Sequence, residues 1–237
     1  MTTLNFLGKS VLFFFVIFCF SNCNKEEEIV LLPGEQSDFI VTAASGNEVV
    51  LDRTWYRNCI PSASMPNVWS SSQRTLSSDE LATTEMFYGS NDCSSDLLMV
   101  TVTVAKLVMQ ENPTPITWVD MDGVTASTAP AGLENVTTAN SIKYTIETAT
   151  MTPMTDAQAN LLNTTALGYG LTDWAARVTK DVQPILAQFA NPGSATIIVL
   201  DNGGEGCVYD GIPDYTSGEE YPSKIGNIPH CGPLHSM

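Results

Sequence analysis

The residues best suited to chemistry lie in the stretch His-Cys-Gly-Pro-Leu-His at positions 230–235. His230, Cys231 and His235 are all of types that bind zinc. The Gly-Pro pair between the histidines excludes a helix that would place both on one face. No Cys-x-x-Cys pair supports a zinc site either. The sequence therefore predicts no metal and no other cofactor, and His230 and His235 are only weak metal candidates.

Nucleophilic catalysis needs a base beside a serine or cysteine, and both histidines of the chain lie in this one stretch. The sequence has no Gly-x-Ser-x-Gly motif. Residues 119–123 and 201–211 are rich in Asp, Asn and Gly, but neither run has the spacing of a calcium loop, and such runs are commoner as turns. We expect no catalytic residue. The 26 acidic residues offer too many carboxylate pairs to choose among, so a secreted hydrolase remains the alternative.

The beginning of the chain has the layout of an export signal. Lys9 is followed by an uncharged apolar run from Val11 to Phe20, then by Ser21, Asn22 and Cys23. The run is about half the roughly 20 residues that a membrane-spanning helix needs. Its length favours a signal peptide over a membrane span.

This order of apolar run, small residues and cysteine resembles the signal of bacterial lipoproteins, in which the cysteine becomes the lipid-bearing first residue. The resemblance implies a signal peptide at 1–22, lipidation of Cys23 and a tether over 23–46 that begins with Glu26 to Glu28. It implies a protein anchored by lipid to the outer membrane of a bacterial cell envelope. The acidic tether is similar to that of surface-exported lipoproteins, and ordinary secretion is the alternative.

Charge and length limit the partners. The formal net charge is −16, and a surface so acidic repels nucleic-acid phosphates and anionic lipid headgroups. We therefore expect no nucleic-acid partner, and contact with the membrane only through the lipid anchor. Residues 47–237 suffice for one domain with a sizeable core, which we expect to be a monomer.

Four cysteines remain outside the signal and anchor. Cys59, Cys93, Cys207 and Cys231 form an even set in an oxidising compartment, which predicts two disulfides. Three pairings are open. We favour Cys59–Cys93 and Cys207–Cys231, because each pair flanks a local unit.

Alternating apolar residues predict about eight strands, most of them linked by short turns. The change to a helical period predicts helices at 155–168, capped by Thr155, and at 171–189, capped by Thr172 and interrupted at Pro184. Closure into a barrel is the usual way to remove sheet edges. We expect an antiparallel up-and-down barrel with a helical insert before the last hairpin; a two-sheet sandwich is the alternative. The strands are predicted over 48–58, 74–81, 82–90, 96–110, 114–121, 141–151, 195–201 and 206–211, with loops over 59–73 and 121–140.

Several of these segments resemble a group of bacterial lipoproteins with a lipocalin-like barrel. The sequences LDRTWYRNC and TTEMFYGSNDCSSDLLMVTVTV resemble its first strands and its first cysteine pair. LGYGLTDWAARVTKDV and CVYDGIPDYTSGEEYPSKI resemble its later helix and closing hairpin. The resemblance covers roughly 49–225 and implies a lipocalin-like, calycin-type fold and anchoring, but no activity.

An eight-stranded barrel either holds one small ligand or is filled by its own side chains. Trp55, Trp69, Trp118 and Trp174 are candidates to line such a cavity, although aromatic residues in strands are more often plain core. We predict a non-catalytic envelope protein that binds a small apolar ligand or a surface partner. A structural or adhesion module with a filled barrel, acting through loops such as 61–72, is a further alternative.

Overall fold

The computed structural model describes residues 39–232, except 52, 63–64, 121–122, 191–192, 203–204 and 213–218. The predictions for Cys23, for the signal peptide and for His235 therefore lie outside the described residues.

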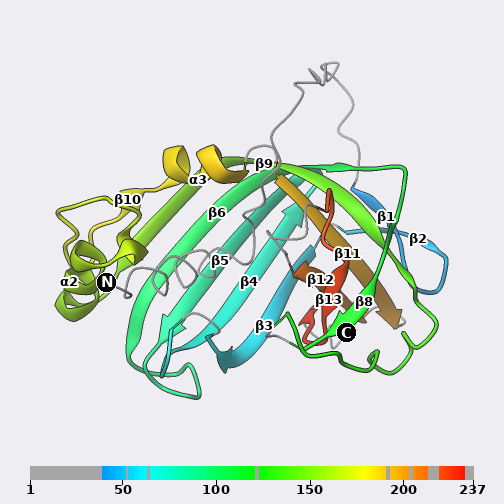
Figure 1. Ribbon diagram of the computed structural model, residues 1–237, viewed down its shortest axis with the longest axis horizontal. Helices are drawn as coiled ribbons and strands as arrows, with labels where there is room; N and C mark the ends of the chain where they lie inside the picture. The colour runs from blue at the N-terminus through cyan, green and yellow to red at the C-terminus, as the bar shows by residue number, and fades with distance from the viewer. Residues whose placement is uncertain are drawn as a thin grey trace, which may run out of the picture.

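Eight antiparallel strands form a closed barrel (Figure 1). Each strand pairs with the next around the barrel, and the last pairs back with the first. The predicted antiparallel barrel is confirmed, and no sandwich forms. The strands, in order, are β3 (Arg53–Pro61), β4 (Trp69–Ser77), β5 (Glu80–Tyr88), β6 (Leu97–Met109), β9 (Thr138–Pro153), β11 (Gly193–Asn202), β12 (Glu205–Ile212) and β14 (His230–Cys231).

Burial alternates along the barrel strands because successive side chains of a strand point to opposite faces. In β4, Ser70, Ser72, Arg74 and Leu76 are buried, while their neighbours are partly or fully exposed. The buried set is mostly polar. Part of the barrel interior is therefore built from polar and charged side chains, beside an apolar core.

The predicted boundary between β4 and β5 was wrong. The structure places the turn at Ser78 and Asp79, with Ser77 paired to Glu80, whereas the sequence analysis placed it after Leu81. The predicted loop 59–73 also contains the first half of β4. Serine is the commonest residue of this segment, and it does not distinguish a strand from a loop.

The first helical prediction was nearly right and the second was largely wrong. Helix α2 (Asp156–Thr164) is capped by Thr155, and the 3₁₀ helix η2 (Ala166–Gly168) follows. Residues 171–179 form no helix; β10 (Lys180–Asp181) precedes α3 (Gln183–Ala190). Pro184 lies in the first turn of α3, where a missing N–H costs nothing, so it begins that helix instead of breaking it.

Additional short strands attach to the barrel. β1 (Ile40–Thr42) pairs with β2 (Glu48–Val50) on the opposite side of the view from α2 and β10 (Figure 1). Phe39, Val41 and Ala43, which precede the predicted barrel domain, are buried in the barrel core. A second apolar cluster lies where β8 (Thr117–Val119) pairs with β13 (Lys224–Gly226), and β7 (Thr114–Pro115) pairs with β9. In the part of the chain that the structure describes, no helix is long and apolar enough to span a membrane.

Candidate functional site

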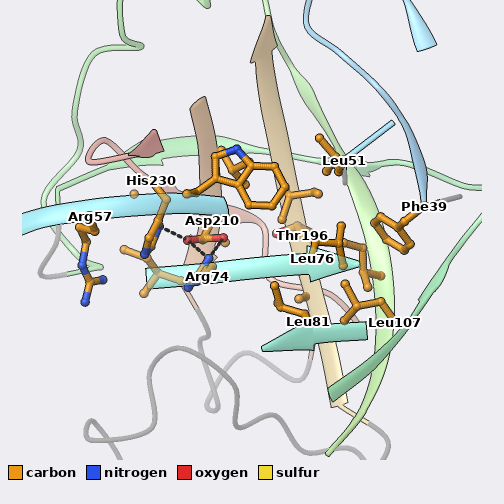
Figure 2. A pocket seen from close by; sticks show the side chains of 18 of the residues that line it. Phe39, Leu51, Arg57, Arg74, Leu76, Leu81, Leu107, Thr196, Asp210 and His230 are labelled. Carbon is orange, nitrogen blue, oxygen red and sulfur yellow. Dashed lines mark hydrogen bonds and ion pairs between the residues drawn. The ribbon is translucent and has the colours of Figure 1, made fainter. Parts of the chain in front are cut away.

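The barrel encloses a cavity of about 100 Å³. Figure 2 shows its two kinds of wall. The apolar wall includes Phe39, Leu51, Leu76, Leu81, Leu107 and Ile142. The polar wall includes Trp55, Arg57, Arg74, Thr196, Asp210 and His230. Seven of these twelve residues come from β3, β4, β5, β6 and β9, where the alternation of the strands directs them inward.

Arg74 and Asp210 form an ion pair on the polar wall. The Arg74 Nη1 atom donates to both carboxylate oxygens of Asp210 at 2.7 Å. Burial alone would raise the pKa of Asp210, but the positive charge of Arg74 and the hydrogen bonds from His230 and Arg74 outweigh it, and the pKa lies well below its usual value. Asp210 is therefore an anion at any physiological pH.

His230 lies between Asp210 and Ser72. Its Nε2 atom is 2.8 Å from the Ser72 Oγ atom, and its Nδ1 atom is 3.1 Å from Asp210 Oδ2. Burial and the positive charges of Arg74 and Arg57 lower the pKa of His230 to about 4, against the opposing effect of Asp210. The imidazole is therefore neutral near pH 7. In that state Nδ1 carries the proton and faces the Asp210 carboxylate, and Nε2 accepts from the Ser72 hydroxyl.

The order Ser72, His230, Asp210 is that of a serine acyl-transfer triad. Two features weaken it as a catalyst. Ser72 is 2% exposed and does not line the cavity, so a substrate carbonyl in the cavity does not meet its hydroxyl. A base of pKa about 4 is mostly unable to take a proton near neutral pH. The arrangement instead fixes the orientation of the His230 ring in the cavity wall.

A second buried ion pair joins β3 to β5. The Arg57 Nη2 atom lies 2.7 Å from Glu85 Oε1, and the two side chains are 8% and 12% exposed. The same nitrogen lies 3.5 Å from the Ser70 hydroxyl. Each of the two arginines that line the cavity thus has a carboxylate partner, and the two ion pairs together carry no net charge.

On β3, two hydrogen-bond donors of the polar wall have no partner among the described residues. Trp55 Nε1 and Arg57 Nε are both buried and unbonded. The residues lie two positions apart on β3, so they share its inward face. A buried donor without a partner lowers the stability of the fold by about 1–3 kcal/mol. A guest that supplies an acceptor to such a donor would recover part of this free energy.

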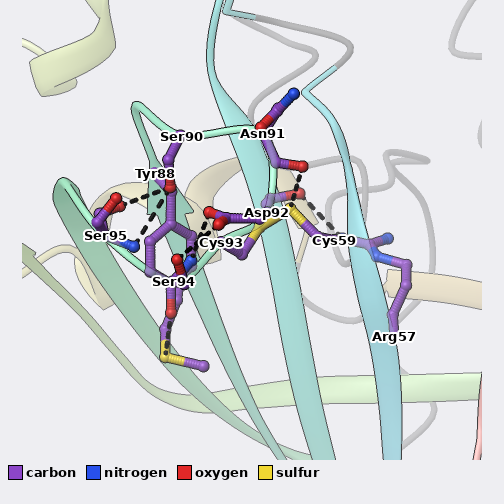
Figure 3. Close-up of a disulfide and its surroundings, with 11 residues drawn as sticks. Arg57, Cys59, Tyr88, Ser90, Asn91, Asp92, Cys93, Ser94 and Ser95 are labelled. Atoms are coloured by element: carbon purple, nitrogen blue, oxygen red, sulfur yellow. Dashed lines mark hydrogen bonds between the residues drawn. A yellow bond between two sulfur atoms is a disulfide. The ribbon is translucent and has the colours of Figure 1, made fainter.

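The structure contains both predicted disulfides, Cys59–Cys93 and Cys207–Cys231. The first joins the end of β3 to the turn between β5 and β6 (Figure 3). In that turn, hydrogen bonds from Ser94 lower the pKa of Asp92. The second disulfide links directly opposed residues of β12 and β14. Neither disulfide lines the cavity.

The other residues predicted as site candidates do not come together in one site. Of the four tryptophans, only Trp55 lines the cavity. No group of three or more His, Cys, Asp and Glu side chains in the described ranges is arranged to hold a metal. In the two Asp- and Gly-rich runs, Asp210 pairs with Arg74 and Asp120 accepts from Asn227. His230 lies in the hydrogen-bonded wall of the cavity, beside Ser72 and Asp210.

Sequence reasoning missed Ser72, Arg57 and Arg74. A signal for Arg57 was present: it lies two residues after Trp55, which was expected in the core, and so shares its face of the strand. No comparable signal marked Ser72 or Arg74, because both faces of β4 carry polar residues.

The fold and the site define the chain as an eight-stranded antiparallel β-barrel with a small internal cavity of mixed polarity. A comparison with known protein families found no matching family model. A comparison with curated proteins found no match either.

Proposed function

We propose that the protein binds a small, mainly apolar molecule inside the barrel and has no catalytic role. The observation that carries this proposal is the cavity of about 100 Å³ with apolar walls and one polar side. Pockets for drug-sized ligands measure about 300–1,000 Å³, so this cavity suits something much smaller. An engineered apolar cavity of about 150 Å³ binds benzene. A guest of about five or six non-hydrogen atoms is therefore the appropriate scale.

A cavity-filling variant tests this proposal. Ala195 lines the cavity, and Ala195→Leu adds three carbon atoms at that wall. Wild-type protein, titrated with benzene or a five-membered ring compound and followed by NMR, is expected to bind one molecule. Ala195→Leu is expected to weaken binding at least tenfold. Ala131 is exposed on a loop, so Ala131→Leu makes the same chemical change outside the cavity and should leave binding intact. Equal binding by all three proteins would contradict a guest in the barrel.

We further propose that the binding domain is lipid-anchored in the bacterial cell envelope through Cys23. The supporting observations are the apolar run, the small residues and the cysteine of the N-terminal sequence, followed by acidic residues. Expression of the full chain in a bacterium should yield a membrane-bound protein with an acylated N-terminal cysteine. Cys23→Ser should release it into the soluble fraction, and Cys19→Ser should not. A mature chain that starts elsewhere, without acyl mass, would favour ordinary secretion.

A hydrolase is the second candidate, because the hydrogen-bonded series Ser72, His230, Asp210 is the one arrangement in the described residues with nucleophilic connectivity. Its burial and the low pKa of His230 favour the binding role. A structural or adhesion module would instead bind no small molecule and would act through its loops.

A further inference from the structure

The unpartnered groups of the cavity wall are all donors. Trp55 is 3% exposed and Arg57 is 8% exposed, and their Nε1 and Nε atoms have no hydrogen-bond partner among the described residues. The side chains beside these donors are already engaged with other groups: both carboxylate oxygens of Asp210 accept from Arg74, and the Thr196 hydroxyl donates to the Pro222 carbonyl. Trp55 Nε1 and Arg57 Nε therefore lack an acceptor among the described residues.

The charges of the wall are balanced. Arg57 and Arg74 each have a carboxylate partner at 2.7 Å, and His230 is uncharged near neutral pH because its pKa is lowered to about 4. A carboxylate guest would bring a negative charge into a buried site with no cation left to neutralise it. An ammonium guest would bring an uncompensated positive charge, and it has no acceptor atom for the unpaired donors of the wall. Either charge would be costly to bury.

We propose that the ligand of this cavity is an uncharged molecule with a small apolar body and one acceptor oxygen, such as a ketone, aldehyde or ether, that accepts a hydrogen bond from Trp55 Nε1. The apolar body lies against Leu76, Leu81 and Leu107, which line the same cavity. This assignment rests on the proposed function and specifies its ligand class. A hydrogen bond to an otherwise unsatisfied buried donor makes the acceptor-bearing guest about tenfold tighter than its hydrocarbon counterpart.

Four probes of the same ring skeleton test the assignment: cyclopentanone, methylenecyclopentane, cyclopentanecarboxylate and cyclopentylamine. The first two differ only in an oxygen for a methylene group, so they isolate the acceptor. The last two carry opposite charges at pH 7. NMR titration of the wild-type protein is expected to give an affinity for the ketone about tenfold above that for the hydrocarbon, and at least tenfold above those for both ions.

A matched pair of tryptophan variants assigns the donor. Trp55→Phe removes the indole N–H from the cavity wall and should lower ketone affinity to about the level of the hydrocarbon. Trp118 also has a buried Nε1 without a partner in the described residues, but it packs in the second apolar cluster and does not line the cavity. Trp118→Phe should therefore leave the preference for the ketone unchanged.

A direct readout uses the ligand-induced shift in the wild-type protein. In wild-type protein, the indole N–H resonance of Trp55 should move downfield with the ketone and not with the hydrocarbon; its absence from the Trp55→Phe spectrum assigns it. Equal affinities for ketone and hydrocarbon, with binding still blocked by Ala195→Leu, would overturn the acceptor while leaving the proposed function standing. Tightest binding of the carboxylate or the amine would overturn the neutral ligand. Failure of all four probes to bind would overturn both proposals.

Discussion

His230 and Cys231 are consecutive residues of β14 and lie on opposite faces of the barrel wall. His230 is 1% exposed and contacts Ser72 and Asp210 inside the barrel. Cys231 is paired opposite Tyr56, which is 45% exposed, and forms a disulfide with Cys207. A strand of two residues has few backbone hydrogen bonds to hold it. The closing strand is therefore fastened by a hydrogen-bonded side chain on one face and by a covalent bond on the other.

The disulfide of β14 should stabilise both the fold and the cavity. Replacing Cys207 and Cys231 together by serine removes the covalent closure of a loop of 24 residues in sequence, and the free energy of unfolding should fall by about 3 kcal/mol. His230 is carried by the loosened strand, so ligand affinity should fall as well. Denaturant unfolding and NMR titration measure the two effects.

The other disulfide provides a matched control. Cys59 and Cys93 are separated by 34 residues, and their double replacement by serine should lower the free energy of unfolding by a similar amount, about 3–4 kcal/mol. This disulfide lies away from the cavity, so affinity should not change. If both double variants lost affinity equally, β14 would have no special role in holding the site.

Acid should destabilise the protein through His230. Its pKa is lowered from 6.5 in the unfolded chain to about 4 in the folded protein, so between these values only the unfolded chain binds the proton. This contribution to stability is complete above about pH 6.5 and disappears as the pH falls to about 4, amounting to something on the order of 3 kcal/mol. Denaturant unfolding at pH 7.5 and pH 4.5 measures it.

His230→Gln retains a polar side chain that does not titrate, so the loss of stability between these two pH values should become smaller. His235→Gln removes the other histidine of the chain and should leave the loss unchanged. Asp210, whose pKa is lowered by Arg74 and His230 despite its burial, adds a further loss only below about pH 4. An unaltered pH dependence in His230→Gln would show that other groups carry it.

The Arg74–Asp210 ion pair should be costly to break from one side. Asp210→Asn removes the carboxylate that faces Arg74, which is 7% exposed, and should lower the free energy of unfolding by about 2–3 kcal/mol. Adding Arg74→Met should recover part of this loss. Asp79→Asn breaks the exposed Lys106–Asp79 pair and should cost less than about 1 kcal/mol. Equal losses for both pairs would mean that burial does not strengthen the inner one.

Ser72 should not react as a nucleophile. Incubation of the folded protein with a fluorophosphonate reagent should leave Ser72 unmodified, because its hydroxyl is buried and its base is too weak near neutral pH. Peptide mass spectrometry measures the modification. Labelling of Ser72 in the wild-type protein that disappears in His230→Gln would contradict the non-catalytic proposal and favour the hydrolase.

The barrel fold could be predicted from the sequence, but the polar side chains that line its cavity could not. The alternation of apolar residues in β5, β6 and β9 predicts strands, and the need to remove sheet edges predicts that these strands close into a barrel. The positions of the cysteines predicted both disulfides. Alternation does not reveal which face of β4 lies inward, because Ser, Thr, Gln and Arg occupy both. The pairing of Arg74 with Asp210 depends on that choice and on contacts across 136 residues.

The prediction of the second helix, at 171–189, was largely wrong for a different reason. The buried Trp174 and the charged residues around it imitate a helical period between Leu171 and Val182. In the structure, Asp173 and Arg177 adopt left-handed backbone angles with φ of 62°, which no right-handed helix accommodates. Such local turns follow from tertiary packing around the tryptophan and leave no regular pattern in the sequence.

The position of β14 sets the order of assembly. Ser72 and His230 are 158 residues apart in the chain, and Cys231 pairs with β3, one of the first strands to be synthesised. Contacts of such long range form slowly, because a large loop must close before they contribute. Until residues 230–231 arrive, β3 is an open sheet edge, and an unpaired edge is a site at which another chain can pair and start aggregation.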